Sequence, residues 1–160
     1  MLEILRKRRD EEGFTLIELM VVVLIIAILI AIAIPTFLGA RARAQDRSAQ
    51  SNIRNAFTAE KTYFTDAQAY TDNANGALSA IEPSINWVNA VSAGSTAGNV
   101  AVKATPDGTS VCVNAHAASG NDFGLLDIAS GSNAGTWYKS GTIDCTSNGV
   151  STTGLKRTGW

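Results

Sequence analysis

The feature that most constrains this chain is an apolar run from Phe14 to Ile34, in which Thr15 and Glu18 are the only polar residues. At about 1.5 Å rise per residue, a helix of this length measures roughly 30 Å, the thickness of the hydrocarbon core of a bilayer. A β-strand is usually complete within about 3–10 residues, so the run is too long for one strand. We therefore predict a membrane-spanning helix. Glu18 is its unusual residue, because a carboxylate in a membrane segment is costly unless it has a partner.

Basic residues flank the apolar run on both sides. The cluster Arg6-Lys7-Arg8-Arg9 precedes it, and four arginines follow it: Arg41, Arg43, Arg47 and Arg54. The first cluster favours a cytoplasmic N-terminus, but the arginines on the far side compete with that signal, so charge alone does not fix the orientation. The net charge of the whole chain is −1, which gives no support for nucleic-acid binding through bulk charge.

The start of the apolar run resembles a known motif. The stretch Gly13-Phe14-Thr15-Leu16-Ile17-Glu18-Leu19-Met20-Val21-Val22 is similar to the processing and methylation motif of type IV prepilins and the related pseudopilins. The resemblance covers residues 1–64 and includes a short charged leader, the Gly-Phe junction, a glutamate four residues later, the apolar run, Pro35 and a polar helix. Beyond residue 70 the resemblance is architectural only.

The resemblance implies how the N-terminus is processed. Cleavage between Gly13 and Phe14 removes residues 1–13 as a leader and leaves the apolar run on the mature protein, and the new Phe14 amine is then N-methylated. In a growing filament, Glu18 of an incoming subunit is expected to neutralise the Phe14 amine of its neighbour, because unpaired charges in hydrocarbon are expensive. A plainer role for Glu18, as a complement to the positive end of its own helix, is also open.

An ordinary secretory signal is the alternative interpretation of the N-terminus. Ala31-Ile32-Ala33 mimics a small-x-small cleavage site. However, the apolar run exceeds the ~7–15 residues usual for the core of a signal peptide. Asp10-Glu11-Glu12 also separates the basic cluster from the run, and Pro35 lies close behind the alternative cut. We therefore favour cleavage after Gly13.

Pro35 divides the predicted helix into two parts, a membrane-spanning and filament-core part at 14–35 and an amphipathic part at 36–70. Proline lacks an N–H donor and crowds the carbonyl four residues back, so we expect a helix kink there. An apolar stripe at helical spacing follows and passes through Glu60 or Lys61. We predict that this stripe packs against the rest of the protein, with three core members: Ile53, Phe57 and Phe64.

Residues 71–160 are predicted to form a globular head. Residues 71–98 are rich in Asn, Ala, Gly and Ser and predict an irregular connection, with a short helix near either Ala77–Ile81 or Trp87–Val91. Alternating apolar residues then predict four strands, at 100–104, 110–115, 123–128 and 136–140. Pro106-Asp107-Gly108 predicts a hairpin turn between the first two strands. We expect the last six residues, 155–160, to form a loop or mobile tail.

The expected fold class is therefore α+β, with a small antiparallel sheet laid against a long helical spine, and the resemblance implies the type IV pilin fold. Cys112 and Cys145 are the only two cysteines. An even number of cysteines in a chain with an export segment favours a disulfide, while two free thiols are the alternative. The resemblance implies that the segment between the two cysteines faces outward, so we expect Asn114 to Asp144 to be the surface-exposed part of the disulfide-bounded region 112–145.

The sequence carries no recognisable catalytic constellation. His116 is the only histidine, and no nucleophile motif accompanies it, so we interpret it as an ordinary structural residue. No Cys or His spacing fits zinc, and neither a phosphate-binding glycine loop nor an EF-hand loop is present. Gly120-Asn121-Asp122 offers oxygen ligands for calcium, but a turn is the preferred interpretation. We expect no catalytic residue, no metal and no cofactor.

The resemblance implies a structural protein, a subunit of a type IV pilus. It predicts a single-pass cytoplasmic membrane protein that polymerises through its N-terminal helix into an extracellular filament for adhesion, twitching motility or DNA uptake. The implied partners are other pilin subunits, a prepilin peptidase and methyltransferase, and the inner-membrane pilus assembly machinery. A minor pilin or a type II secretion pseudopilin is the nearest alternative. From a different class, a binding protein or enzyme with an uncleaved signal anchor remains open.

Overall fold

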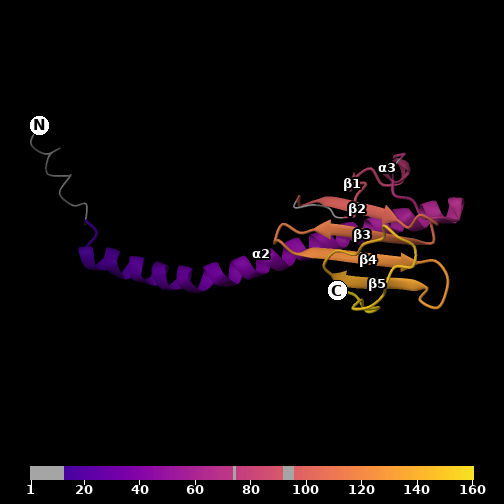
Figure 1. The fold of residues 1–160 in the computed structure, drawn as a ribbon. Helices are drawn as coiled ribbons and strands as arrows, with labels where there is room; N and C mark the ends of the chain where they lie inside the picture. The colour runs from indigo at the N-terminus through magenta and orange to yellow at the C-terminus, as the bar shows by residue number, and fades with distance from the viewer. Residues whose placement is uncertain (1–12, 74, 92–95) are drawn as a thin grey trace, which may run out of the picture. The chain divides into compact units, whose positions relative to one another are not determined.

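The computed structural model describes residues 13–73, 75–91 and 96–160 (Figure 1). Most of the predicted leader, residues 1–12, lies outside the described residues. The chain divides into two compact units, Met1–Ala40 and Arg41–Trp160. We call the second of these the head unit.

Helix α2 (Leu16–Ala67) contains 52 residues and carries both parts of the predicted spine. Every large apolar side chain of the apolar run is exposed, and the helix is long and apolar enough to cross a membrane. Pro35 lies inside the helix, which continues through it. The hydroxyl of Thr36 donates to the carbonyl oxygens of Ile32 and Ala33 at 3.2 and 2.9 Å. The kink at Pro35 stays a prediction.

The part of α2 inside the head unit buries one face. Ile53 is fully buried, as predicted, and Phe57 and Phe64 are partly buried and pack against the same core. Alanines at helical spacing on this face let the sheet approach closely, since Ala49, Ala56 and Ala59 are all buried. The apolar stripe therefore faces the sheet, and the hydrophobic effect fixes the helix against it.

A five-stranded sheet in the order β1-β2-β3-β4-β5 packs on this face of α2 (Figure 1). Strands β2 to β5 pair antiparallel, and all four were predicted from sequence to within a residue at either end. The strand bounds are Asn86–Val88 for β1, Asn99–Ala104 for β2, Ser110–His116 for β3, Asp122–Ile128 for β4 and Gly135–Ser140 for β5. The α+β architecture is confirmed.

The connection between α2 and the sheet differs from the prediction at one point. Helix α3 occupies Ala77–Ile81, one of the two positions predicted. The alternative position, Trp87–Val91, is not helical, because Asn86–Val88 form β1 and pair parallel with β2. The Trp87 indole also donates to the nearby carbonyl of Glu82 at 3.0 Å.

The two faces of the sheet build separate apolar clusters. The face toward α2 contributes valines and leucines to the main core, including Val100, Val113 and Leu125. The opposite face carries a smaller cluster around the Cys112–Cys145 disulfide, with Leu126 and Ile143. The bridge spans a sequence separation of 33 residues.

The structure shows the segment 155–160 as the predicted loop rather than as a mobile tail. Lys156 forms an isolated bridge with Tyr138, and the Trp160 indole donates to the carbonyl of Gly124 at 3.0 Å. The expectation that the region between the cysteines faces outward is wrong for β4, because Leu125 and Leu126 are fully buried. These two side chains lie on opposite faces of the sheet, and each packs in one of the two apolar clusters.

Candidate functional site

The predicted site residues at the N-terminus form one local cluster around the start of α2. Thr15 and Glu18 make a reciprocal capping box: the Glu18 carboxylate accepts from the Thr15 N–H at 2.9 Å and from the Thr15 hydroxyl at 2.6 Å. The Thr15 hydroxyl in turn accepts from the Glu18 N–H at 3.2 Å. Gly13 and Phe14 lie just outside the helix, and Phe14 is 85% exposed. The Gly13–Phe14 bond therefore adjoins the capping box directly.

This geometry gives Glu18 a partner within its own chain. A capping box satisfies backbone donors that the first turn of a helix otherwise leaves open. A negative charge in this position also complements the positive end of the helix dipole. The structure therefore accounts for how a carboxylate is tolerated at the edge of an apolar run. The sequence signal for this capping box is the Thr-x-x-Glu pattern, which the sequence predictions did not single out.

A second polar group, which sequence reasoning missed, lies inside the head unit. Asp127 on β4 is only 2% exposed and accepts from Lys61 Nζ at 2.6 Å, from Thr136 Oγ1 at 2.7 Å and from the Tyr70 hydroxyl. Burial, followed by the hydrogen bond and charge of Asp127, raises the pKa of Tyr70. The phenol therefore stays protonated and donates. This network connects α2 with strands β4 and β5.

Three aromatic rings surround the Lys61 ammonium. Its Nζ lies 5.2 Å from the ring centre of Phe57, 5.8 Å from that of Phe64 and 5.3 Å from that of Tyr70. Cation–π contacts at such distances add attraction to the ion pair with Asp127. The only sign of this buried polar network in the sequence was that Glu60 and Lys61 interrupt the apolar stripe.

Glu60 is the second buried acid of the head unit. It is fully buried, its Oε2 accepts a long hydrogen bond from the Thr71 N–H at 3.4 Å, and its Oε1 has no partner among the described residues. Burial, with the nearby charge of Asp72, raises the pKa of Glu60 from 4.5 to about 8, against the opposing effect of Thr71. Glu60 is therefore protonated at neutral pH.

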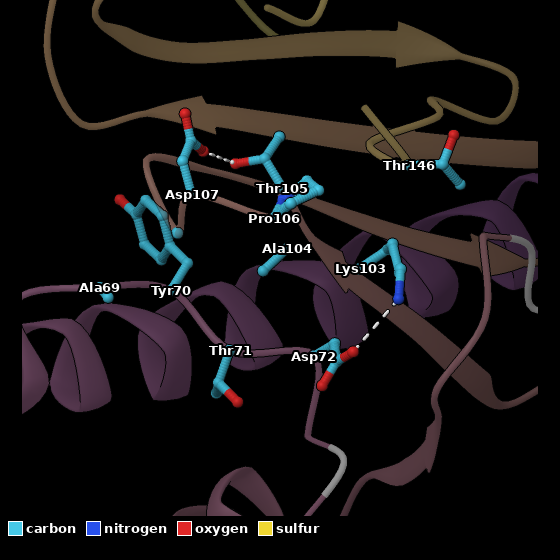
Figure 2. Close-up of a pocket in the computed structure, with 11 residues that line it drawn as sticks. Ala69, Tyr70, Thr71, Asp72, Lys103, Ala104, Thr105, Pro106, Asp107 and Thr146 are labelled. Atoms are coloured by element: carbon cyan, nitrogen blue, oxygen red, sulfur yellow. Dashed lines mark hydrogen bonds and ion pairs between the residues drawn. The ribbon is translucent and has the colours of Figure 1, made fainter. Parts of the chain in front are cut away.

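A hollow of about 550 Å³ opens where the end of α2 meets the β2–β3 turn (Figure 2). Asp72 and Lys103 pair across it at 3.2 Å. On its rim, Asp107 accepts from the Thr105 hydroxyl at 2.7 Å and from Thr109. These hydrogen bonds lower the pKa of Asp107, and the hydrogen bond from the Thr105 hydroxyl has the largest effect. The rim of the hollow therefore carries a negative charge.

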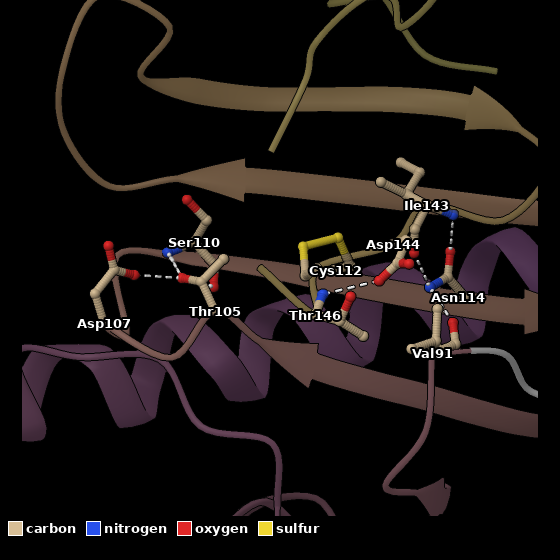
Figure 3. Close-up of a disulfide and its surroundings, with 10 residues drawn as sticks. Val91, Thr105, Asp107, Ser110, Cys112, Asn114, Ile143, Asp144 and Thr146 are labelled. Atoms are coloured by element: carbon tan, nitrogen blue, oxygen red, sulfur yellow. Dashed lines mark hydrogen bonds between the residues drawn. A yellow bond between two sulfur atoms is a disulfide. The ribbon is translucent and has the colours of Figure 1, made fainter. Parts of the chain in front are cut away.

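Cys112 and Cys145 are joined in a disulfide on the outer side of the sheet (Figure 3). The neighbouring Asn114 is buried and fixes the same loop: its amide donates to the carbonyls of Val91 and Ile143 at 2.8 Å each, and its Oδ1 accepts from the Ile143 N–H. By the loop-entropy model, a disulfide that closes a loop of this length adds about 4 kcal/mol to the free energy of unfolding.

The residues considered for other chemistry take structural positions. His116 pairs with Asp122 across β3 and β4 at 2.8 Å, and the segment Gly120-Asn121-Asp122 leads from a turn into β4. Within residues 13–73, 75–91 and 96–160, no cluster of three or more His, Cys, Asp or Glu side chains is arranged to hold a metal ion.

Comparison with known proteins places these features in a family. Residues 8–34 match the family model described as the prokaryotic N-terminal methylation motif. Over 112 residues the chain is 38% identical to the type IV wide pilus major component PilA4 of Thermus thermophilus, a match that covers 62% of this chain and 85% of that protein. The chain belongs to the type IV pilin family.

A second relative supports the same assignment over a shorter stretch. Over 63 residues the chain is 46% identical to the type IV major pilin protein PilA of Myxococcus xanthus. This match covers 39% of the chain and 29% of the relative, so the chain spans less than a third of that protein's length. As a type IV pilin, the chain is a structural subunit that assembles with other pilin subunits. It is anchored in the membrane as a precursor and then becomes part of a surface filament.

Proposed function

We propose that this pilin is a major, non-enzymatic component of its pilus. The observation that carries the proposal is the apolar run of α2, whose large side chains are all exposed in the single chain. Such a surface needs a lipid bilayer before assembly and the helices of other subunits after it. The names of both relatives, each a major pilin or major pilus component, favour a major over a minor pilin or a secretion pseudopilin.

The processing that we propose begins at the Gly13–Phe14 bond. A prepilin peptidase removes residues 1–13 on the cytoplasmic side, and a methyltransferase modifies the new Phe14 amine. The exposure of Phe14 and the absence of helix at Gly13 and Phe14 support this, because the bond lies outside the regular hydrogen bonding of α2. The proposed mature chain then keeps residues 14–35 as its membrane and filament-core segment, 36–70 as its amphipathic helical part and 71–160 as its head.

Glu18 has two successive partners in this proposal. In the membrane-anchored subunit, Thr15 satisfies its carboxylate through the capping box. During assembly, Glu18 turns to the Phe14 amine of a neighbouring subunit, which places two opposite charges together in an apolar surrounding. The inner-membrane assembly machinery supplies the site where this exchange takes place. Adhesion, twitching motility or DNA uptake then belongs to the polymer.

Mass spectrometry of material sheared from the cell surface tests the proposal. We expect the dominant N-terminal peptide to begin at N-methylated Phe14, and we expect this chain to be the most abundant protein of the filaments. A peptide that begins at Met1 would indicate an uncleaved signal anchor, and one that begins at Ile34 would indicate ordinary secretion. Either result contradicts the proposal. Trace abundance in filaments made mainly of another pilin would instead identify a minor pilin.

A further inference from the structure

The beginning of the head unit carries excess positive charge. Three exposed arginines, Arg41, Arg43 and Arg47, follow directly after the first unit on α2. We call them the arginine collar. Asp46 lies among them but is already bound by the Ser119 hydroxyl and by the Asn121 amide. No ion pair joins the collar to any part of the chain that the structure describes.

The other end of the head unit is acidic. Here the Tyr70 N–H donates to the carbonyl of Gly108 at 2.9 Å, which ties the β2–β3 turn to the end of α2 beside the hollow of Figure 2. Asp66 and Asp107 are exposed at this end, and the single lysine of the hollow is already paired with Asp72.

One carboxylate oxygen of Asp107 is available to bind a cationic side chain. The donors from Thr105 and Thr109 all bind its Oδ1 atom, which leaves Oδ2 able to accept from a further donor. A guanidinium group suits such a place, because its planar set of N–H donors matches carboxylate and carbonyl oxygens together.

The two charged ends are separated along α2. Arg43 lies 24 residues before Ala67, the last residue of the helix, and at about 1.5 Å per residue this corresponds to roughly 36 Å. Figure 1 shows the β2–β3 connection at the C-terminal end of α2, while the β3–β4 connection lies at the end of the head unit where α2 enters it. The collar and the hollow therefore cannot meet within one subunit.

Copies inserted in one membrane share one orientation, so a filament built from them is a parallel polymer. In such a polymer, a contact between copies displaced along the axis joins two different surfaces and repeats without closing. Opposite charge on those two surfaces favours the correct partner and offset. The head unit has this arrangement: a collar of arginines that form no ion pair with the described residues at one end, and an acid-rimmed hollow at the other.

We propose that the arginine collar of one subunit docks into the acidic hollow of a second copy, displaced by roughly 30–36 Å along the filament, with Arg47 or Arg43 bound to Asp107. This inference rests on the proposed function, since it requires the chain to be a repeating subunit. It goes beyond the contact between apolar helices, because it names a polar contact between neighbouring head units that sets their axial offset.

Cross-linking between two different variants tests the contact directly. Subunits with Arg43→Cys and subunits with Asp107→Cys are produced in the same cells, and intact sheared filaments are treated with a short bis-maleimide. The two natural cysteines are tied in a disulfide and do not react. We expect a dimer only when both variants are present. The matched control replaces Arg43→Cys with Lys139→Cys, an exposed position on β5, and should give no dimer.

Charge reversal measures the contribution of the contact. The double variant Arg43→Glu, Arg47→Glu keeps good helix formers at exposed positions, so the fold is not at risk. We expect about tenfold less of this variant in sheared filaments at unchanged membrane level, as for the loss of a charged contact across an interface. Asp107→Asn, which retains the Oδ1 acceptor of the turn, should lower filament recovery in the same direction.

The outcomes separate this inference from the proposed function. Filaments that contain the chain at normal level with both variants, and give no cross-linked dimer, overturn the docking and leave the pilin role intact. Loss of the arginine variant from the membrane fraction itself, again without a dimer, would mean that the collar binds anionic lipid headgroups instead. If filaments from cells that produce the unmodified chain contain no trace of it, the proposed function itself is wrong, and the docking inference that rests on it is wrong as well.

Discussion

Glu60 should make the stability of the head unit fall as pH rises. Its pKa is 4.5 in an exposed carboxyl and about 8 in the fold, so the native state holds its proton over a range in which the unfolded state has lost it. The contribution is complete below the unfolded pKa and disappears as pH rises through the folded one. Between pH 5 and pH 8 these two values imply a loss of roughly 3–4 kcal/mol from this group.

The perturbation that isolates this effect is Glu60→Gln, which keeps the shape of the side chain but does not titrate. Other groups also titrate in this range, so the useful quantity is the difference in unfolding free energy between variant and unmodified chain. We expect the unfolding free energy of Glu60→Gln to rise, relative to that of the unmodified chain, by roughly 3–4 kcal/mol from pH 5 to pH 8. Any constant cost of burying the amide cancels in the comparison.

Urea unfolding of the detergent-solubilised chain, followed by tryptophan fluorescence, provides the assay. All three tryptophans lie in the head unit, so the signal reports this unit alone. The matched control is Asp66→Asn, which removes an exposed carboxylate from the same helix and should leave the pH dependence unchanged. A difference between Glu60→Gln and the unmodified chain that stays constant with pH would refute the reasoning.

Three further predictions follow from the other contacts. Thr15→Val removes the capping hydroxyl, and amide exchange in the first turn of α2 in detergent should become about fivefold faster, the equivalent of about 1 kcal/mol, whereas Thr15→Ser should restore protection. Lys61→Met leaves Asp127 buried without its cation. It should lower the unfolding free energy by about 2 kcal/mol, less than the loss of a fully buried pair because the Lys61 side chain is 45% exposed. Replacing Cys112 and Cys145 together by serine should lower the unfolding free energy by about 4 kcal/mol.

Each of these has a result that would contradict it. Equal exchange rates for Thr15→Val and Thr15→Ser would show that the hydroxyl does not cap the helix. If adding Asp127→Asn to Lys61→Met fails to recover stability, the lost charge pairing is not the cause. The variant with both cysteines replaced by serine should have the unfolding free energy of the unmodified chain with its disulfide reduced. If the variant is instead as stable as the unmodified chain with its disulfide intact, the loop-entropy estimate is wrong.

The long helix and the strands could be predicted from sequence because their signals are local. The apolar run is too long for a strand, and Pro106-Asp107-Gly108 separates two alternating segments that the structure pairs as β2 and β3. The Thr-x-x-Glu pattern at Thr15 and Glu18 also specifies its own capping box through neighbouring residues only. In each case the interacting groups lie within a few residues of one another.

The features that the sequence predictions missed depend on partners far away in the sequence. Trp87 belongs to a strand because β2 pairs with it, and Trp160 is held by Gly124, 36 positions earlier. A count of polar residues near the C-terminus cannot reveal such contacts, since the same composition suits a solvated tail.

The apolar run, the methylation motif and strands β2 to β5 could all be recognised from the residues alone, but strand β1 could not. The shared buried site of Lys61, Tyr70 and Asp127 and the burial of Glu60 in the head unit depend on the tertiary fold. The physical reason is that the protonation and pairing of a charged group depend on its solvation, and solvation is set by which distant segments cover it. A helical stripe shows that Glu60 and Lys61 are neighbours, but it does not show which of them is buried.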